Sequence, residues 1–160
     1  MRHFHSGDGS VNRPGELWLS PGEIHMGILS KLFGPKQPRV LPVHVDDSNF
    51  KTEVRQSRIP VLLDVWSPLC APCRQLEPVV IRLATRYRGR VKVAEINASA
   101  APRTMKKLFV SATPTVIYFK KGQELDRVEG FRGEPYHQDI IDNELLQPAD
   151  RAANAANMAR

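Results

Sequence analysis

Hydrophobic and polar positions from Val43 onward follow two alternating periods, which predict the order of elements along the chain. Short apolar runs rich in branched residues predict buried strands at 43–45, 59–66 and 91–96. Apolar residues that recur every three or four positions predict helices at 46–57, 70–89, 101–109 and 136–146. Two further strands at 115–119 and 124–129 flank a Lys121-Gly122 turn, which is typical of a hairpin.

Strands that alternate with helices predict an α/β fold. We expect a mainly parallel sheet with helices on both faces and an antiparallel edge contributed by the hairpin. The folded domain is predicted to span residues 43–147. Residues 1–42 contain five prolines and six glycines, so they are predicted to form a mostly disordered leader with an amphipathic helix at 23–33. Met26 is a second candidate start, and residues 148–160 are predicted to be a disordered tail.

Composition narrows the class of protein. A chain of 160 residues fits one domain, and no apolar run is long enough to predict a membrane-spanning helix. Two cysteines exclude a disulfide-dense secreted scaffold and a four-cysteine zinc site. The net charge of +6 is spread along the chain, and its densest stretch, residues 82–92, carries no nucleic-acid recognition motif. The start lacks the pattern of a secretory signal, so the expected location is cytoplasmic and no nucleic-acid partner is expected.

The two cysteines form a Cys70-Ala71-Pro72-Cys73 motif at the junction of a buried strand and a helix. Cysteines three residues apart in a first helical turn are close enough for a disulfide. The helix N-terminus favours the thiolate of Cys70, which attacks disulfides, and Cys73 can then resolve the mixed disulfide. Pro72 suits a first helical turn. One alternative interpretation is that the two cysteines are half of a metal site, but the sequence places no further ligand near Cys70, so no metal is expected. The other alternative is that the two cysteines are chemically inert.

The sequence resembles the thioredoxin family over about two-thirds of its length, from Val43 to Leu146. The central strand with its buried acid and Trp corresponds to Val61–Trp66, and the active-site motif with its following basic residue corresponds to Cys70–Arg74. The proline within the active-site helix corresponds to Pro78, and the cis-proline loop corresponds to Ala112–Thr115. The next strand with its turn corresponds to Phe119–Gly122, and the glycine after the last strand corresponds to Gly130.

The resemblance implies three catalytic residues. Cys70 is the nucleophile, Cys73 is the resolving thiol, and Asp64 is a buried carboxylate that moves protons beneath Cys73. Burial disfavours the charged carboxylate and should raise its pKa, which suits a base that works near neutral pH. A structural acid held by a hydrogen bond is the alternative reading of Asp64.

The resemblance also implies a substrate-binding surface. Trp66 flanks the disulfide, Ala71 and Pro72 belong to the motif itself, Thr113 pairs its backbone with a client peptide, and Pro114 shapes that surface through a cis bond. Gly130 belongs to the same surface.

Four positions depart from the family pattern. Leu69 replaces a Trp before the first cysteine, Ala71 replaces a Gly, Thr113 replaces an aliphatic residue, and Glu95 stands where a Lys is usual near the buried acid. A second carboxylate at Glu95 should push Asp64 further toward its neutral form, unless it points to solvent. Substrate range and redox potential therefore stay open.

The expected fold is thioredoxin-like, with a central mixed five-stranded sheet flanked by helices on both faces. The expected activity is that of a protein-disulfide reductase with no bound cofactor, acting as a monomer on disulfide-bearing client proteins. Its electrons would come from a flavin/NADPH thioredoxin reductase. The alternatives are a disulfide oxidase or isomerase, and a binding module or subunit whose role does not need the cysteines.

Overall fold

The computed structural model describes residues 38–146. The predicted 23–33 helix, the leader up to residue 37 and the 148–160 tail lie outside the described residues. The elements follow in the predicted order, with two short π-helical segments, η1 and η2. They are β1 (Val43–Val45), η1 (Lys51–Arg55), β2 (Val61–Trp66), α2 (Ala71–Arg86), β3 (Lys92–Asn97), α3 (Pro102–Leu108), β4 (Thr115–Lys120), β5 (Gln123–Glu129), α4 (Glu134–Ile140) and η2 (Ile141–Leu145).

The strands form one five-stranded sheet in the order β1-β3-β2-β4-β5. β3 runs parallel to both β1 and β2, whereas β4 is antiparallel to β2 and to β5. The predicted mixed sheet is therefore confirmed, and its parallel part is limited to β1, β3 and β2. The hairpin contributes the antiparallel part, because β4 joins the sheet beside the central strand.

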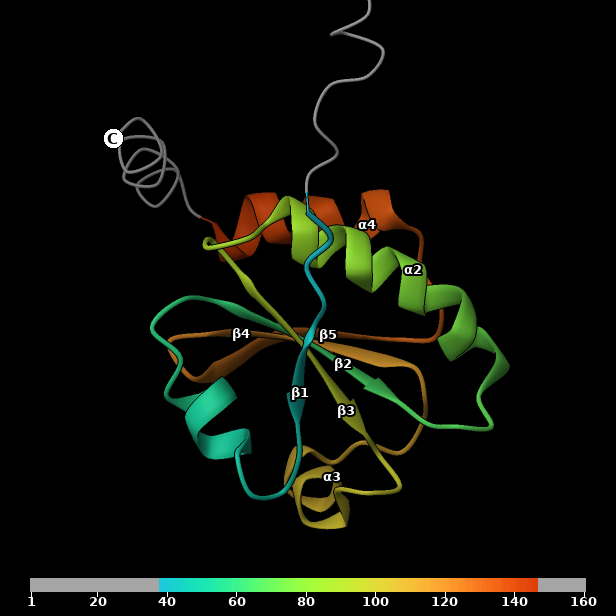
Figure 1. The fold of residues 1–160 in the computed structure, drawn as a ribbon. Helices are drawn as coiled ribbons and strands as arrows, with labels where there is room; N and C mark the ends of the chain where they lie inside the picture. The colour runs from blue at the N-terminus through green and yellow to red at the C-terminus, as the bar shows by residue number, and fades with distance from the viewer. Residues whose placement is uncertain (1–37, 147–160) are drawn as a thin grey trace, which may run out of the picture. The chain divides into compact units, whose positions relative to one another are not determined.

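Helices cover both faces of the sheet, as Figure 1 shows with α2 and α4 on one side and α3 on the other. Neighbouring residues of a strand point to opposite faces, so Leu62 packs in the cluster formed with α2 and α4 while Leu63 packs in the cluster formed with η1 and α3. Leu76, Val80 and Leu83 of α2 are all buried against the first of these faces. Both faces of the central strand are thus buried, as its continuous apolar run indicates.

The segment predicted as a helix at 46–57 has a different internal structure. Asp46 caps its start, because the Asp46 Oδ1 accepts the backbone N–H of Ser48 at 2.7 Å and of Asn49 at 3.1 Å. The following turn is widened, since Gln56 donates its backbone N–H to the carbonyl of Lys51, five residues earlier. Phe50 packs inward from this segment into the core.

The side chain of Asp47 caps α3, a helix more distant in the chain. Its carboxylate accepts the backbone N–H of Arg103 at 3.2 Å and of Thr104 at 2.7 Å, in the first turn of α3. The N-cap residue of α3 is Ala101, which has no side-chain acceptor of its own. A residue more than fifty positions away therefore supplies the cap that α3 lacks.

The hairpin turn has left-handed backbone at both central residues, Lys121 (φ 52°) and Gly122 (φ 75°). A side chain at Gly122 would collide with the backbone carbonyl of Arg55, so glycine is required there. The last predicted helix begins two residues early and ends in the π-helical segment η2. Within residues 38–146, no helix combines the length and the apolar run that a membrane crossing requires.

Candidate active site

Cys70 and Cys73 form a disulfide at the start of α2, with their Cα atoms 5.2 Å apart. Cys70 is the N-cap of this helix, and its Sγ accepts the backbone N–H of Cys73 at 3.2 Å. That N–H lies at the positive end of the helix dipole, so it favours the thiolate of Cys70 once the disulfide is reduced. The structure thus places the predicted motif in the predicted context.

The disulfide lies just below the surface. Cys70 is 8% exposed and Cys73 is 6% exposed, while the residues on either side of Cys70 lie open to solvent. Leu69 is 97% exposed, and Ala71 and Pro72 are also exposed. A partner that reaches the sulfur atoms must therefore contact Leu69 or the Ala71-Pro72 turn.

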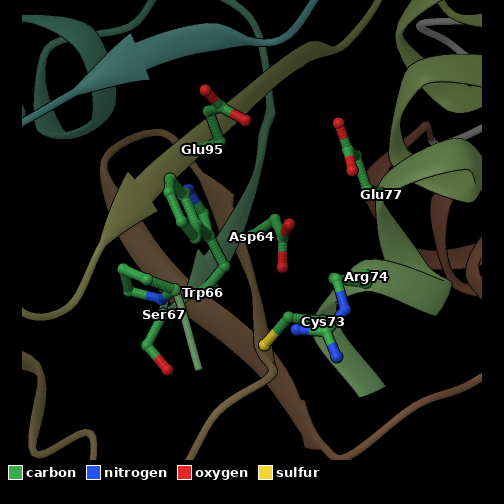
Figure 2. A pocket seen from close by; sticks show the side chains of 8 residues that line it. Asp64, Trp66, Ser67, Cys73, Arg74, Glu77 and Glu95 are labelled. Atoms are coloured by element: carbon green, nitrogen blue, oxygen red, sulfur yellow. The ribbon is translucent and has the colours of Figure 1, made fainter. Parts of the chain in front are cut away.

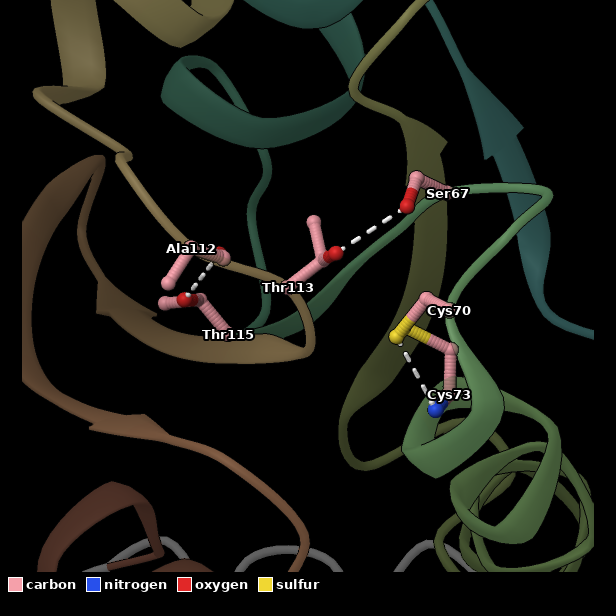
Figure 3. The surroundings of a disulfide bond; sticks show 6 residues. All are labelled: Ser67, Cys70, Cys73, Ala112, Thr113 and Thr115. Carbon is pink, nitrogen blue, oxygen red and sulfur yellow. Dashed lines mark hydrogen bonds between the residues drawn. A yellow bond between two sulfur atoms is a disulfide. The ribbon is translucent and has the colours of Figure 1, made fainter.

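The cis-proline loop faces the cysteines, as Figure 3 shows. The Thr113–Pro114 peptide bond is cis, as the resemblance implies. The Thr113 hydroxyl lies 3.0 Å from the Ser67 hydroxyl, which ties this loop to the loop that carries Cys70. On the other side, Gly130 donates its backbone N–H to the Pro114 carbonyl at 2.8 Å, with a φ of 80° that favours glycine.

Asp64 lies behind Cys73, in a cavity of about 240 Å³. The cavity is lined by Asp64, Trp66, Ser67, Pro68, Cys73, Arg74, Glu77 and Glu95. Figure 2 shows the Asp64 carboxylate projecting from β2 toward Cys73 and Arg74 on α2. Asp64 is 4% exposed, and its Oδ1 has no hydrogen-bond partner among the described residues. The hydrogen bond that a purely structural acid needs is therefore missing at this oxygen.

Burial, together with the negative charges of Glu95 and Glu77, raises the pKa of Asp64 to about 7. Asp64 and Glu95 are paired in register on the parallel strands β2 and β3, so both side chains leave the same face of the sheet. Glu95 lines the cavity and also lies 3.7 Å from His44 Nδ1 on β1. The Glu that replaces the family's usual Lys at position 95 therefore raises the pKa of Asp64, as predicted.

Sequence reasoning gave no site role to four residues of this cavity, Ser67, Pro68, Arg74 and Glu77. Glu77 follows Cys73 by four positions on α2, and this helical spacing could have placed it beside the cavity. Arg74 appeared only as part of the active-site motif. No pattern in the sequence indicates a role for Ser67, because its hydrogen bond to Thr113 joins two loops that are 46 residues apart.

Trp66 is half-buried in the cavity wall, and its indole Nε1 is buried without a partner among residues 38–146. His137 is fully buried in the core, where its Nδ1 lies 2.6 Å from the Tyr118 hydroxyl. Within the described part of the chain, no group of three His, Cys, Asp or Glu side chains is arranged to hold a metal ion.

Comparison with known proteins agrees with this geometry. The thioredoxin family model matches residues 41–143, well over half of the chain. Thioredoxin 1 of Nostoc sp. is 43% identical over 86 residues, covering 54% of this chain and 80% of that protein. The thioredoxin of Synechocystis sp. is 42% identical over the same shares. The chloroplastic thioredoxin M4 of Arabidopsis thaliana is 38% identical over 87 residues, covering 54% of this chain and 45% of that protein.

Proposed function

Because the chain belongs to the thioredoxin family of thiol-disulfide oxidoreductases, we propose that Cys70, Cys73 and Asp64 carry its protein-disulfide reductase activity. The redox-active group is the disulfide of the protein itself. The observation that supports the assignment is the position of this disulfide, with Cys70 at the N-terminus of α2 and a protonatable carboxylate in the cavity behind Cys73.

The reaction is a two-step thiol–disulfide exchange. The Cys70 thiolate attacks one sulfur of a client disulfide, the client S–S bond breaks, and a mixed disulfide forms while the second client sulfur leaves as a thiolate. The Cys73 thiol then gives its proton to Asp64, and its thiolate attacks the Sγ of Cys70. The Cys70–Cys73 disulfide forms, the client leaves with both sulfurs reduced, and two electrons have passed to it.

Asp64 suits the proton transfer in the second step. A base works best when its pKa lies near the working pH, and the pKa of about 7 meets this condition. Cys73 and Asp64 line the same cavity, so the proton has a short route between them.

The substrate surface is proposed to consist of Trp66, Ala71, Pro72, Thr113, Pro114 and Gly130. Thr113 makes no backbone hydrogen bond with the described residues, so its N–H and C=O are available to an extended client segment. The bonds from Thr113 to Ser67 and from Gly130 to Pro114 hold this edge beside the disulfide. Exposed Ala71 and Pro72 would border the docked segment.

Proteins of this family act on disulfide-bearing clients and are recharged by a reductase. For this chain we propose a flavin/NADPH thioredoxin reductase as the electron donor and the cytoplasm as the compartment, because a protein dithiol stays reduced where cellular reductants keep thiols reduced. Residues 43–147 are proposed to carry the reaction as a monomer, since the chain's own helices cover both faces of the sheet.

The test is the reduction of insulin disulfides driven by dithiothreitol, together with the reduction potential of the cysteine pair. Wild type should accelerate insulin reduction, and the Cys70→Ser, Cys73→Ser double variant should not. A potential near about −270 mV fits a reductase, whereas a value above about −200 mV fits an oxidase or isomerase. Wild-type protein that fails to accelerate insulin reduction would contradict the proposal and favour a binding role.

A further inference from the structure

Phe109 stands at a backbone position that normally belongs to glycine. It follows the last residue of α3 with φ 52° and ψ 39°, which is the left-handed region. Phe109 donates its N–H to the Lys106 carbonyl at 3.3 Å, and Val110 donates to the Met105 carbonyl at 3.1 Å. This pair of bonds is the Schellman motif that ends helices, and its left-handed residue is usually Gly because a Cβ strains that conformation.

Burial does not compensate for this strain. Phe109 is 86% exposed, so its ring contributes almost no packing to the fold. The contact that accompanies a Schellman motif is made by Met105 and Val110, which pack against the core without Phe109. The ring of Phe109 therefore adds strain and little packing, and natural sequences break local rules mainly at functional sites.

The charges next to Phe109 indicate what kind of partner fits it. Lys106 and Lys107, in the last turn of α3, are exposed and form no ion pair with any described residue. Arg103, on the first turn, is paired with Asp47 at 3.3 Å. The end of α3 therefore presents one apolar ring beside two uncompensated positive charges, which complements an apolar pocket bordered by carboxylates.

The position of Phe109 places this contact near the disulfide. Phe109 lies four residues before Thr113, so the two are at most about 14 Å apart along the chain. Thr113 in turn is bonded to Ser67, three residues before Cys70. Arg127 on β5 fixes the end of α3 by donating its Nη2 to the Leu108 carbonyl at 2.9 Å. A protein that exchanges electrons with Cys70 can therefore contact Phe109 at the same time.

We propose that Phe109, together with Lys106 and Lys107, is a docking contact for the reductase that recharges the Cys70–Cys73 disulfide. Clients differ in sequence and are read through the backbone of Thr113, whereas the same reductase returns in every cycle. A side chain of fixed shape and charge suits that constant partner. This inference rests on the proposed function, and it assigns the contact to one half of the catalytic cycle.

The experiment compares the full chain with its Phe109→Gly variant in two assays. The first follows NADPH oxidation by the thioredoxin reductase of the same cell, with insulin as the final acceptor. The second replaces NADPH and the reductase with dithiothreitol. We expect Phe109→Gly to raise the KM for the reductase about tenfold with little change in kcat, and to leave the dithiothreitol-driven rate unchanged. The wild-type KM should also rise with ionic strength, and less so when Lys106 and Lys107 are both Ala.

Lys121→Gly is the matched control, because Lys121 is the other described residue besides glycine with a left-handed backbone. It should leave both assays unchanged. Phe109→Gly should unfold at the same or a higher urea concentration than wild type, and Phe109→Asn, which also tolerates the left-handed region, should repeat the kinetic effect.

Each outcome has a separate meaning. An unchanged KM for the reductase in both Phe109 variants would overturn the inference. An equal loss in the dithiothreitol assay would move the contact to the client and overturn the assignment to the reductase. A wild-type protein inactive in both assays would instead refute the proposed function.

Discussion

Replacing Asp64 with Asn should stabilise the oxidised protein at alkaline pH and change its stability little near pH 4. Asp64 has an ordinary pKa of 3.8 in the unfolded chain, but burial and the charges of Glu95 and Glu77 raise it to about 7 in the folded protein. Between these two values the folded state holds a proton that the unfolded state has lost. The free energy of unfolding contributed by this group therefore falls as the pH rises from about 4 to about 7, and stays low above that.

The size of the effect follows from the two pKa values. Each pKa unit corresponds to about 1.4 kcal/mol, so the charged carboxylate destabilises the folded state by about 4 kcal/mol at pH 8. Asn has nearly the same shape and carries no charge. The difference in the free energy of unfolding between Asp64→Asn and wild type should therefore grow by about 4 kcal/mol between pH 4 and pH 8.

Urea unfolding of both oxidised proteins at intervals from pH 4 to pH 9 measures this difference directly. Titrating groups that are not coupled to Asp64 contribute equally to both proteins and cancel. Glu95→Gln and Glu77→Gln, each made in the wild-type background, should lower the pKa of Asp64 and so reduce the loss of stability between pH 4 and pH 8. A difference between Asp64→Asn and wild type that does not vary with pH would show that Asp64 has an ordinary pKa, and the argument for a buried proton acceptor would fail.

Three further predictions concern other residues. Cys73→Ser should accumulate client proteins as mixed disulfides on Cys70, seen as dithiothreitol-sensitive bands on gels; their absence would contradict the nucleophilic role. Burial lowers the pKa of His137 to about 4, so below pH 6.5 the unfolded chain binds a proton that the folded protein does not. The contribution of His137 to the free energy of unfolding should therefore fall by up to about 3 kcal/mol from pH 6.5 to 4, and the difference between His137→Gln and wild type in urea unfolding should change by this amount; a constant difference would contradict the lowered pKa. Asp47→Ala should lower the Tm more than Asp47→Asn, because Asn keeps one acceptor for the first turn of α3; equal effects would argue against the cap.

The sequence predicted the elements of the sheet and the helix that follows Cys70, because a buried strand and an amphipathic helix each have a regular hydrophobic period. It also placed Asp64 in the buried central strand, since an acid inside an apolar run has few alternatives. The pairing of Asp64 with Glu95 could be anticipated through the family resemblance. Within the described residues, these features depend on neighbours in the chain or on a shared strand register.

Features that depend on contacts between distant residues could not be predicted. Asp47 precedes the segment 51–55 in the chain, but tertiary structure brings α3 close enough for its carboxylate to cap that helix instead. The Ser67–Thr113 bond and the charge of Glu77 beside Asp64 have the same origin. The left-handed conformation of Phe109 involves only neighbouring residues of the chain, yet the sequence does not indicate it. Glycine is the residue that predicts such a conformation, and this position holds Phe.

Asp64 and Phe109 are both expected to lower the stability of the fold, and their replacement should impair different halves of the catalytic cycle. Asp64→Asn removes the proton acceptor for Cys73, so it should slow insulin reduction with dithiothreitol and with the reductase, and slow it more at pH 7 than at pH 9, where Cys73 loses its proton more readily to solvent. Phe109→Gly should slow only the reductase-driven reaction. If the two variants differ in this way, Asp64 serves the step in which Cys73 attacks Cys70, and Phe109 serves the contact with the reductase. Neither side chain would then be explained by a contribution to stability. If Phe109→Gly instead slows both reactions as Asp64→Asn does, the assignment of Phe109 to the reductase contact fails.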